Sequence, residues 1–247
     1  MTIPYEPEIF GFPINVHLVL EYLAFILGFR YYVYLRKSKP DPISKMNRLS
    51  ILIGAIFGAY FGSRIMGYLE NPLTNMTPQQ LIALVNTKTI MGGLFGGLLG
   101  VELAKKIIGE KQSSGDLFVF PLILAIIIGR IGCFLTGVNE FTYGEITTSF
   151  TGMDLGDGLL RHPIALYEIA FLIVLWIVLW RIKPMIIDRA GLLFKLFMLS
   201  YFGFRFGIEF IKPNVFYFFG LSSIQWLCII CYIYYFRTLK SIFKYAY

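Results

Sequence analysis

Residues 115–136 read GDLFVFPLILAIIIGRIGCFLT, an apolar run whose interior holds one charged side chain, Arg130. About 20 helical residues cross the roughly 30 Å hydrocarbon core of a bilayer, so this run is long enough to span a membrane. A charge inside such a helix costs roughly 2.5–3.5 kcal/mol on insertion scales, and such residues usually face the protein interior and function there. The stretch therefore predicts a membrane helix with a functional residue on it.

The composition of the whole chain also favours a membrane protein. Of 247 residues, 57% are hydrophobic and 15% are charged, whereas soluble domains average about 45–50% and about 25%. A soluble domain of this length could not bury so many apolar side chains, so the surplus must face lipid. Similar apolar runs lie near residues 14–35, 49–69, 90–108, 115–136, 163–182, 190–211 and 219–238. We expect an all-α integral membrane protein of about seven transmembrane helices, forming a single domain over residues 1–247.

The lysines and arginines indicate the orientation of the chain. They gather in the connections 36–48, 105–111 and 181–189 and in the tail 237–244. The alternate connections hold one each: Lys88, Arg161 and Lys212. By the positive-inside rule, the N-terminus is expected outside and the C-terminus in the cytoplasm. The net charge of +7 therefore reflects topology, and we expect no nucleic-acid partner.

Two of the connections expected outside the cytoplasm are longer than a tight link needs. Residues 70–89 form an arm-like connection, in which 77–85 is expected to be a short amphipathic helix at the membrane surface. Residues 137–161 form a head-like loop that is too polar to lie in lipid. Long loops in compact proteins are usually functional or disordered.

Three arginines are predicted to lie at one depth in the membrane. Arg64, Arg130 and Arg205 each follow the expected cytoplasmic start of a helix by about 15 residues, which places them about 22 Å up. Three carboxylates are expected near the same level: Glu21, Glu168 and Glu209. Arginine keeps its charge and its planar fork suits two phosphate oxygens, so such a ring could bind an anionic phosphodiester. Internal ion pairs that hold helices together are the alternative.

Glycines and cysteines have simpler interpretations. Glycine recurs at small-xxx-small spacing at positions 54, 58 and 62 and again at 92, 96 and 100, which predicts close helix contact. Gly96 and Gly97 could instead allow a lipid headgroup to approach. Cys228 and Cys231 form a C-x-x-C without a second ligand pair, so we expect no metal site.

Four sequence motifs and one isolated residue together resemble a known family. They are Gly129-Arg130-Ile131-Gly132-Cys133-Phe134 followed by Tyr143-Gly144, Arg161-His162-Pro163 with Leu166-Tyr167-Glu168, Tyr201 through Lys212, Gly62-Ser63-Arg64 with Tyr68, and Gln225. In this order, over nearly the whole chain, they are similar to the motifs of the bacterial prolipoprotein diacylglyceryl transferases. The sequence departs from that pattern at Phe95, where the family commonly has histidine, and at Cys133, where it has asparagine.

The resemblance implies a membrane transferase of lipoprotein biosynthesis. Such an enzyme moves the diacylglyceryl group of phosphatidylglycerol to the lipobox cysteine in the signal peptide of a prolipoprotein, forming a thioether. It implies a multi-pass protein of the bacterial plasma (inner) membrane, surrounded by membrane lipids, with an active site that faces the outer leaflet and needs no cofactor or metal. The catalytic candidates are Arg130, Arg205 and His162.

The substrate-binding candidates that the resemblance implies are Arg64, Tyr201, Glu209, Tyr167, Glu168, Gly132, Cys133, Gly144, Gly96, Gly97 and Gln225. His162 is a candidate base for the acceptor thiol because a free imidazole pKa near 6.5 suits that task. The alternative for His162 is a capping role beside Pro163. His17, at the outer end of the first helix, is a weaker candidate for the base, and we expect it to be interfacial.

Two other functions stay open at this point. Phe95 and Cys133 favour a relative that binds phospholipid without reacting, or that uses another acceptor. A lipid or organic-anion transporter would also use intramembrane arginine–carboxylate pairs. Against the transporter, the charges are expected near the outer face of the membrane, and no inverted repeat is visible.

Overall fold

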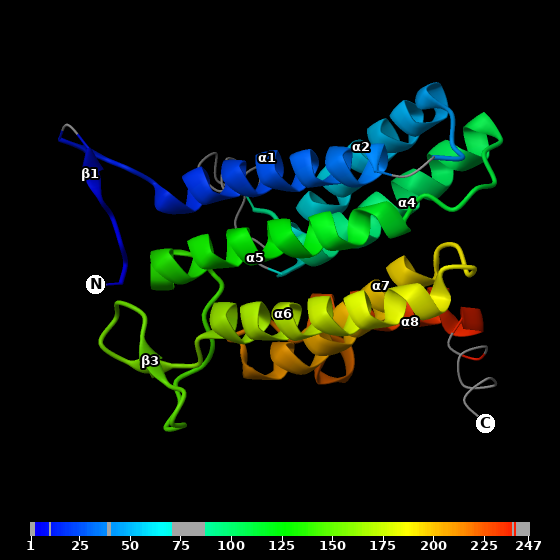
Figure 1. Cartoon of the computed structure of the whole chain (residues 1–247). Coiled ribbons are helices and arrows are strands. Elements are labelled where there is room, and N and C mark those ends of the chain that lie inside the picture. The colour runs from blue at the N-terminus through cyan, green and yellow to red at the C-terminus, as the bar shows by residue number, and fades with distance from the viewer. Residues whose placement is uncertain (1–2, 10, 39–40, 71–86, 239, 241–247) are drawn as a thin grey trace. The chain divides into compact units, whose positions relative to one another are not determined.

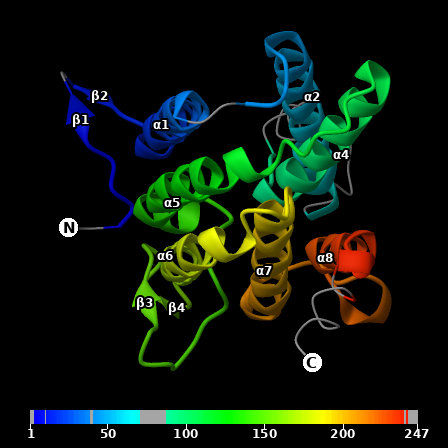
Figure 2. The same ribbon diagram turned by 45° about the vertical axis from the view of Figure 1, so that its right-hand side comes forward.

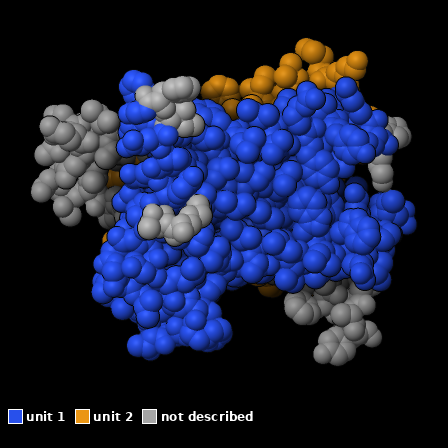
Figure 3. All heavy atoms as spheres, turned by 60° about the vertical axis from the view of Figure 1, so that its left-hand side comes forward, with its two compact units in different colours: residues 1–40, 115–213 blue, residues 41–114, 214–247 orange. Residues whose placement is uncertain are grey.

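The computed structural model describes residues 3–9, 11–38, 41–70, 87–238 and 240. The chain forms two compact units, coloured separately in Figure 3. Unit 1 comprises Met1–Pro40 and Gly115–Pro213, and unit 2 comprises Asp41–Ser114 and Asn214–Tyr247. A single domain over residues 1–247 stays a prediction.

Unit 1 is built on long helices with short 3-10 turns and two small hairpins (Figure 1). Its helices are α1 (Val16–Lys37), α5 (Val119–Thr136), α6 (Ile164–Ile182) and α7 (Leu192–Ile208). Its 3-10 turns are η1 (Asp116–Phe118), η2 (Gly137–Asn139), η3 (Lys183–Ile186) and η4 (Glu209–Ile211). Its strands pair antiparallel, β1 (Glu8–Ile9) with β2 (Phe12–Pro13) and β3 (Met153–Asp154) with β4 (Leu160–Arg161).

Helix α5 lies at the centre of unit 1, between α1 and α6, as Figures 1 and 2 both show. Ile123 of α5, Leu172 of α6 and Phe197 of α7 are fully buried in the packing of these helices. On the outer face of α1, by contrast, Phe25 and Phe29 are 68% and 58% exposed. A water-soluble surface would not carry so many large apolar groups, so this face suits contact with lipid.

Unit 2 contains α2 (Lys45–Glu70), α4 (Ile90–Ile108), η5 (Phe218–Gly220) and α8 (Ser223–Tyr234). Helices α2 and α4 pack side by side through their glycines (Figure 2). A Cβ built on Gly96 would meet the carbonyl oxygen of Gly58 and lie 2.8 Å from Cα of Gly62. Because the two backbones touch where a side chain would stand, the predicted close glycine contact is confirmed.

Helices occur at all the predicted apolar runs, but they differ in length. Within the described residues, the stretches long and apolar enough to cross a membrane are Val16–Lys37, Lys45–Glu70, Asp116–Asn139 and Ile164–Ile186. Helices α7 and α8 have 17 and 12 residues, fewer than the about 20 that span the hydrocarbon core. The chain is thus a mostly helical membrane protein, whereas the count of about seven spanning helices and their orientation stay predictions.

The structure describes the whole head-like loop but only the ends of the arm-like connection. Most of the arm-like connection 70–89, including the predicted amphipathic helix, lies outside the described residues. The head-like loop 137–161 contains the β3–β4 hairpin, which is extended by a hydrogen bond from the Thr147 amide to the Leu160 carbonyl at 2.8 Å.

Candidate functional site

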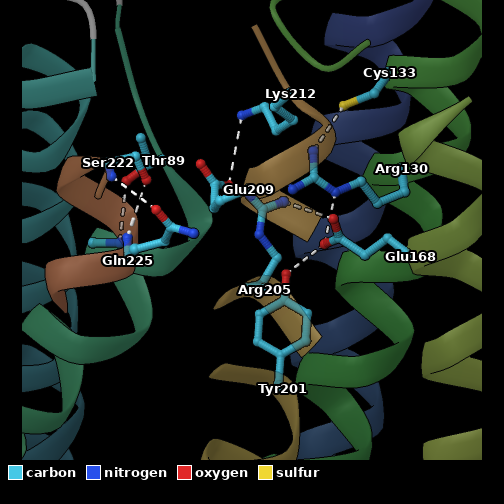
Figure 4. Close-up of polar contacts among 11 residues, drawn as sticks. Thr89, Arg130, Cys133, Glu168, Tyr201, Arg205, Glu209, Lys212, Ser222 and Gln225 are labelled. Atoms are coloured by element: carbon cyan, nitrogen blue, oxygen red, sulfur yellow. Dashed lines mark hydrogen bonds and ion pairs between the residues drawn. The ribbon is translucent and has the colours of Figure 1, made fainter. Parts of the chain in front are cut away.

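The structure brings two of the predicted arginines to one carboxylate (Figure 4). Arg130 projects from α5 and Arg205 from α7, and Glu168 of α6 lies between them. Nε of Arg130 is 2.8 Å from Oε1 of Glu168, and Nη1 of Arg205 donates to Oε2 across 2.9 Å. Together with the neighbouring Tyr201, Glu209 and Lys212, these three residues form what we call the arginine cluster.

The neighbours Tyr201, Glu209 and Lys212 extend this network. The hydroxyl of Tyr201, one turn before Arg205 on α7, donates to Oε1 of Glu168. Nη2 of Arg205 donates to Oε1 of Glu209 across 2.5 Å, and Nζ of Lys212 is 3.8 Å from that oxygen. Tyr201, Arg205 and Glu209 come together because residues four apart share a face of the helix. Lys212 follows Glu209 by three residues.

The cluster is buried and carries a net positive charge. Glu168 and Glu209 are 0% exposed, and Arg130 and Arg205 are 7% and 4% exposed. Three cations against two carboxylates leave a formal charge of +1. Isolated buried ions cost several kcal/mol each, and the alternation of sign with hydrogen bonds offsets that cost. Within these six residues, cations therefore outnumber carboxylates.

Two glycines near the arginines in sequence border open space. Gly129 precedes Arg130, and Gly207 lies two residues after Arg205. A Cβ built on either glycine would find no atom within 4 Å. Both positions therefore border open space. Residues one or two apart point to different sides of a helix, so ligand room beside the arginine side chains stays a prediction.

His162, which follows the head-like loop, faces Tyr167 of α6. Its Nδ1 lies 3.1 Å from the hydroxyl of Tyr167, and that hydroxyl is 2.5 Å from Oγ1 of Thr151. The backbone of His162 is held by the Gly144 amide, which donates to its carbonyl across 2.9 Å. His162 and Tyr167 thus form a local pair at the start of α6, compatible with either a base or a capping role.

The candidate glycines have packing explanations. A Cβ on Gly144 would lie 2.5 Å from Cβ of His162, and one on Gly132 would lie 3.3 Å from Cα of His17. Gly96 is closed off by α2, whereas a Cβ on Gly97 would make ordinary contacts of 3.5 Å with Ala55 and Ala59. Substrate binding by these four glycines stays a prediction.

Unit 2 holds the remaining candidates. Nη1 of Arg64 donates to the Thr87 carbonyl across 3.0 Å. Gln225 closes a capping box at the start of α8, accepting from the Ser222 amide at 2.8 Å. Phe95 is buried against the edge of Tyr234. Convergence of Arg64 with Arg130 and Arg205, which belong to unit 1, stays a prediction.

Sequence reasoning missed one set of contacts. His17, expected to be interfacial, lies with its Nε2 3.6 Å from Sγ of Cys133 and its Nδ1 3.3 Å from Oε1 of Glu140. Arg130 also donates from Nη1 to this sulfur across 3.7 Å. The only available signal was that His17 is one of two histidines in the chain and that it opens an apolar helix.

The fold and the arginine cluster define a helical membrane protein with a buried, positively charged polar site. The profile of the prolipoprotein diacylglyceryl transferase family matches residues 4–239, nearly the entire chain. The chain belongs to this family.

Similar proteins with established names agree. A phosphatidylglycerol–prolipoprotein diacylglyceryl transferase of Chlorobaculum tepidum is 31% identical over 253 residues, covering 90% of this chain and 85% of that protein. A protein of the same name from Bordetella bronchiseptica is 32% identical, over 73% of this chain and 69% of its own length. Another, from Nitratidesulfovibrio vulgaris, is 34% identical over 67% of this chain, and the match spans 63% of that relative, less than two thirds.

Proposed function

We propose that this chain transfers the diacylglyceryl group of phosphatidylglycerol to the lipobox cysteine of a prolipoprotein. The main support is the joint approach of Arg130 and Arg205 to Glu168, in a buried cluster in which arginine and lysine outnumber carboxylates. Family membership and the names of the relatives point to the same reaction. In this proposal the site faces the outer leaflet of the bacterial inner membrane.

The arginine cluster suits the leaving group. Attack on the glyceryl carbon breaks a carbon–oxygen bond and leaves glycerol-1-phosphate, whose phosphate gains negative charge. Guanidinium groups already in place stabilise that charge without reorganising at the moment of reaction. Arg130 and Arg205 would contact the phosphate, and Glu168, with Tyr201 donating to it, would hold the two forks in position.

The acceptor sulfur must lose its proton. An unperturbed thiol has a pKa of about 8.5, so a base near the site accelerates the reaction. His162 is the candidate that the sequence suggests. A Tyr167 hydroxyl at 3.1 Å from Nδ1 can hold its ring in one orientation.

The experiment uses the purified protein in liposomes that contain phosphatidylglycerol, with a synthetic lipobox peptide as acceptor. Mass spectrometry should detect a thioether-linked diacylglyceryl group on the peptide, and an enzymatic assay should detect an equal amount of glycerol phosphate. A peptide with serine in place of the lipobox cysteine is the matched control. Absence of both products, under conditions in which a known transferase works, would contradict the proposed function.

A relative that binds phospholipid without transferring it is the second candidate. Phe95 supports it, because this side chain is buried against Tyr234 and has no group that exchanges protons. Lipid binding that Arg130→Ala abolishes, with no product, would favour this candidate. A large gain of turnover in Phe95→His would show that chemistry had been weakened at this position. Movement of labelled phospholipid across the liposome membrane without product would instead indicate a transporter.

A further inference from the structure

Cys133 lies at the centre of a second polar cluster in unit 1, next to the arginine cluster. Its Sγ is 3.6 Å from Nε2 of His17 and accepts a hydrogen bond from Nη1 of Arg130 at 3.7 Å. Nδ1 of His17 is in turn 3.3 Å from Oε1 of Glu140. The thiol is thus flanked by an imidazole and a guanidinium, and the imidazole by a carboxylate.

These contacts determine where the protons lie. Glu140 can only accept when ionised, so it favours the tautomer of His17 with a proton on Nδ1 and a lone pair on Nε2. The Cys133 thiol can then give its proton to Nε2, and the permanent charge of Arg130 stabilises the sulfur anion. A cysteine paired with a histidine that a third group orients is the arrangement of an activated thiol.

The helix dipole acts in the opposite direction. Cys133 lies in the last turn of α5, which ends at Thr136, and the partial negative charge there disfavours an anion. His17 and Arg130 must outweigh this effect. Both are close enough to do so, because each contacts the sulfur itself.

Cys133 is 7% exposed and borders a pocket. Cys133 lines a small pocket together with Thr142, Tyr143 and Pro163. Among the ionisable groups around the pair, Glu21 of α1 interacts electrostatically with His17, and Tyr143 borders the pocket. Arg130 connects the pair to the arginine cluster through Glu168.

We propose that the Cys133–His17 pair, oriented by Glu140, is the proton acceptor for the incoming thiol, a role that rests on the transfer reaction proposed above. The acceptor thiol gives its proton to Sγ of Cys133, whose own proton has moved to Nε2 of His17. The acceptor thiolate attacks the glyceryl carbon, and the carbon–oxygen bond breaks with its electron pair left on the phosphate oxygen. His17 then gives its proton to the departing glycerol phosphate or to water, and the proton of Cys133 returns to His17.

In this assignment Cys133 is the catalytic base, and His17 and Glu140 are positioning residues. The assignment removes the need for a histidine at position 95. There are two competing explanations. In one, His162 is the base; in the other, the contact between Cys133 and His17 only packs α1 against α5. Two measurements separate these three possibilities.

The first measurement is independent of transfer. The full chain in detergent is treated with iodoacetamide from pH 5.5 to 9, and alkylation of each cysteine is followed by mass spectrometry of peptides. An ordinary thiol reacts roughly 80-fold more slowly at pH 6 than at pH 8, whereas we expect less than about fivefold for Cys133, since a thiolate is already present. Cys228 and Cys231, which are fully buried, report whether the fold stays closed.

Variants test the partners of the sulfur. His17→Asn should slow the alkylation of Cys133 at pH 6 by about tenfold or more. Glu140→Gln should have a smaller effect in the same direction. Glu140 is 38% exposed, so this variant should fold even if His17→Asn does not, and it then provides the test. Asp157→Asn, a matched loss of an exposed carboxylate in the head-like loop, should leave the profile unchanged. A steep profile in the unmodified chain, or no reaction of Cys133 at any pH, would overturn the proposal.

The second measurement is the pH dependence of kcat for transfer in phosphatidylglycerol liposomes. His17→Asn should lower kcat by about 100-fold and steepen its fall toward acid pH, whereas His162→Asn should retain the acid limb of the parent. The reverse result would make His162 the base and overturn the assignment, as would a diacylglyceryl adduct on Cys133. A flat alkylation profile without any transfer would contradict the proposed reaction but support the thiolate pair, whereas transfer with a steep profile would contradict the pair alone.

Discussion

Arg130 and Arg205 lie on different helices, yet they contact the two oxygens of one buried carboxylate. The distances are 2.8 Å from Nε of Arg130 and 2.9 Å from Nη1 of Arg205, both to Glu168. One acidic side chain on α6 therefore positions two cations from α5 and α7, and the geometry of the arginine cluster depends on it.

Removing the charge of Glu168 should destabilise the protein. In Glu168→Gln, two buried guanidinium groups would lose their shared counter-ion, and breaking a buried pair in this way typically costs about 3–5 kcal/mol. Thermal unfolding of the purified protein in detergent measures the loss as a lower Tm. The control is Glu102→Gln, because Glu102 is 49% exposed and 3.9 Å from Lys105, and such pairs contribute about 0–1 kcal/mol. Equal Tm values for the two variants would contradict the central position of Glu168.

The arginines should be sensitive to replacement by lysine. Arg205→Lys keeps a positive charge but loses the planar fork that reaches Glu168 and Glu209 at once. We expect kcat/KM for transfer to fall about 100-fold, equivalent to roughly 2.7 kcal/mol of transition-state stabilisation. Release of glycerol phosphate in the liposome assay measures this.

Arg130→Lys should behave similarly, and the two substitutions should combine to less than the product of their separate effects, since both arginines act through Glu168. Arg181→Lys, on the exposed end of α6, is the matched control and should retain activity. Full activity in either cluster variant would show that point charges suffice and that the paired forks have no special role.

The positions of the helices could be predicted from the sequence with little error. The apolar runs at 90–108 and 163–182 became α4 (Ile90–Ile108) and α6 (Ile164–Ile182), because membrane helices must satisfy their backbone groups internally over a length set by the bilayer. The meeting of Arg130, Glu168 and Arg205 was also predictable, because charged groups at one depth in an apolar medium have few partners other than one another.

The contacts of His17 could not be predicted in this way. Helix α1 is apolar on nearly all sides, so its sequence does not show which face packs on α5. The pairing of His17 with Cys133 depends on the rotation of α1 about its axis, and that rotation is set by close packing at Gly132. The polar composition of residues 137–161 likewise predicted a loop but not the register of the β3–β4 hairpin.

Adjacent glycines of α4 should respond in opposite ways to alanine. Gly96→Ala places a methyl group against the backbone of Gly58 and Gly62, and overpacking of this kind costs about 1–3 kcal/mol. Gly97→Ala makes ordinary contacts and should be neutral or slightly stabilising, since alanine favours helix by about 1 kcal/mol over glycine. Tm values in detergent compare the two. If Gly97→Ala were the more damaging and also lowered lipid binding, a ligand role for that glycine would replace the packing explanation.

The head-like loop offers a test by titration, because Arg161 donates from Nε to Oδ2 of Asp157 across 2.7 Å. This hydrogen bond lowers the pKa of Asp157 from its usual value, which is about 3.9 in an unfolded chain. A lowered pKa in the folded state means that the pair contributes stability above the unfolded value and loses it as pH falls through the folded one. Carboxyl-carbon NMR of labelled protein should therefore show Asp157 titrating below the usual aspartate range. Arg161→Gln should move the midpoint upward and Arg161→Lys less so, because lysine retains the charge. An unchanged midpoint in Arg161→Gln would show that the loop backbone, and not the guanidinium, holds the carboxylate in its ionised form.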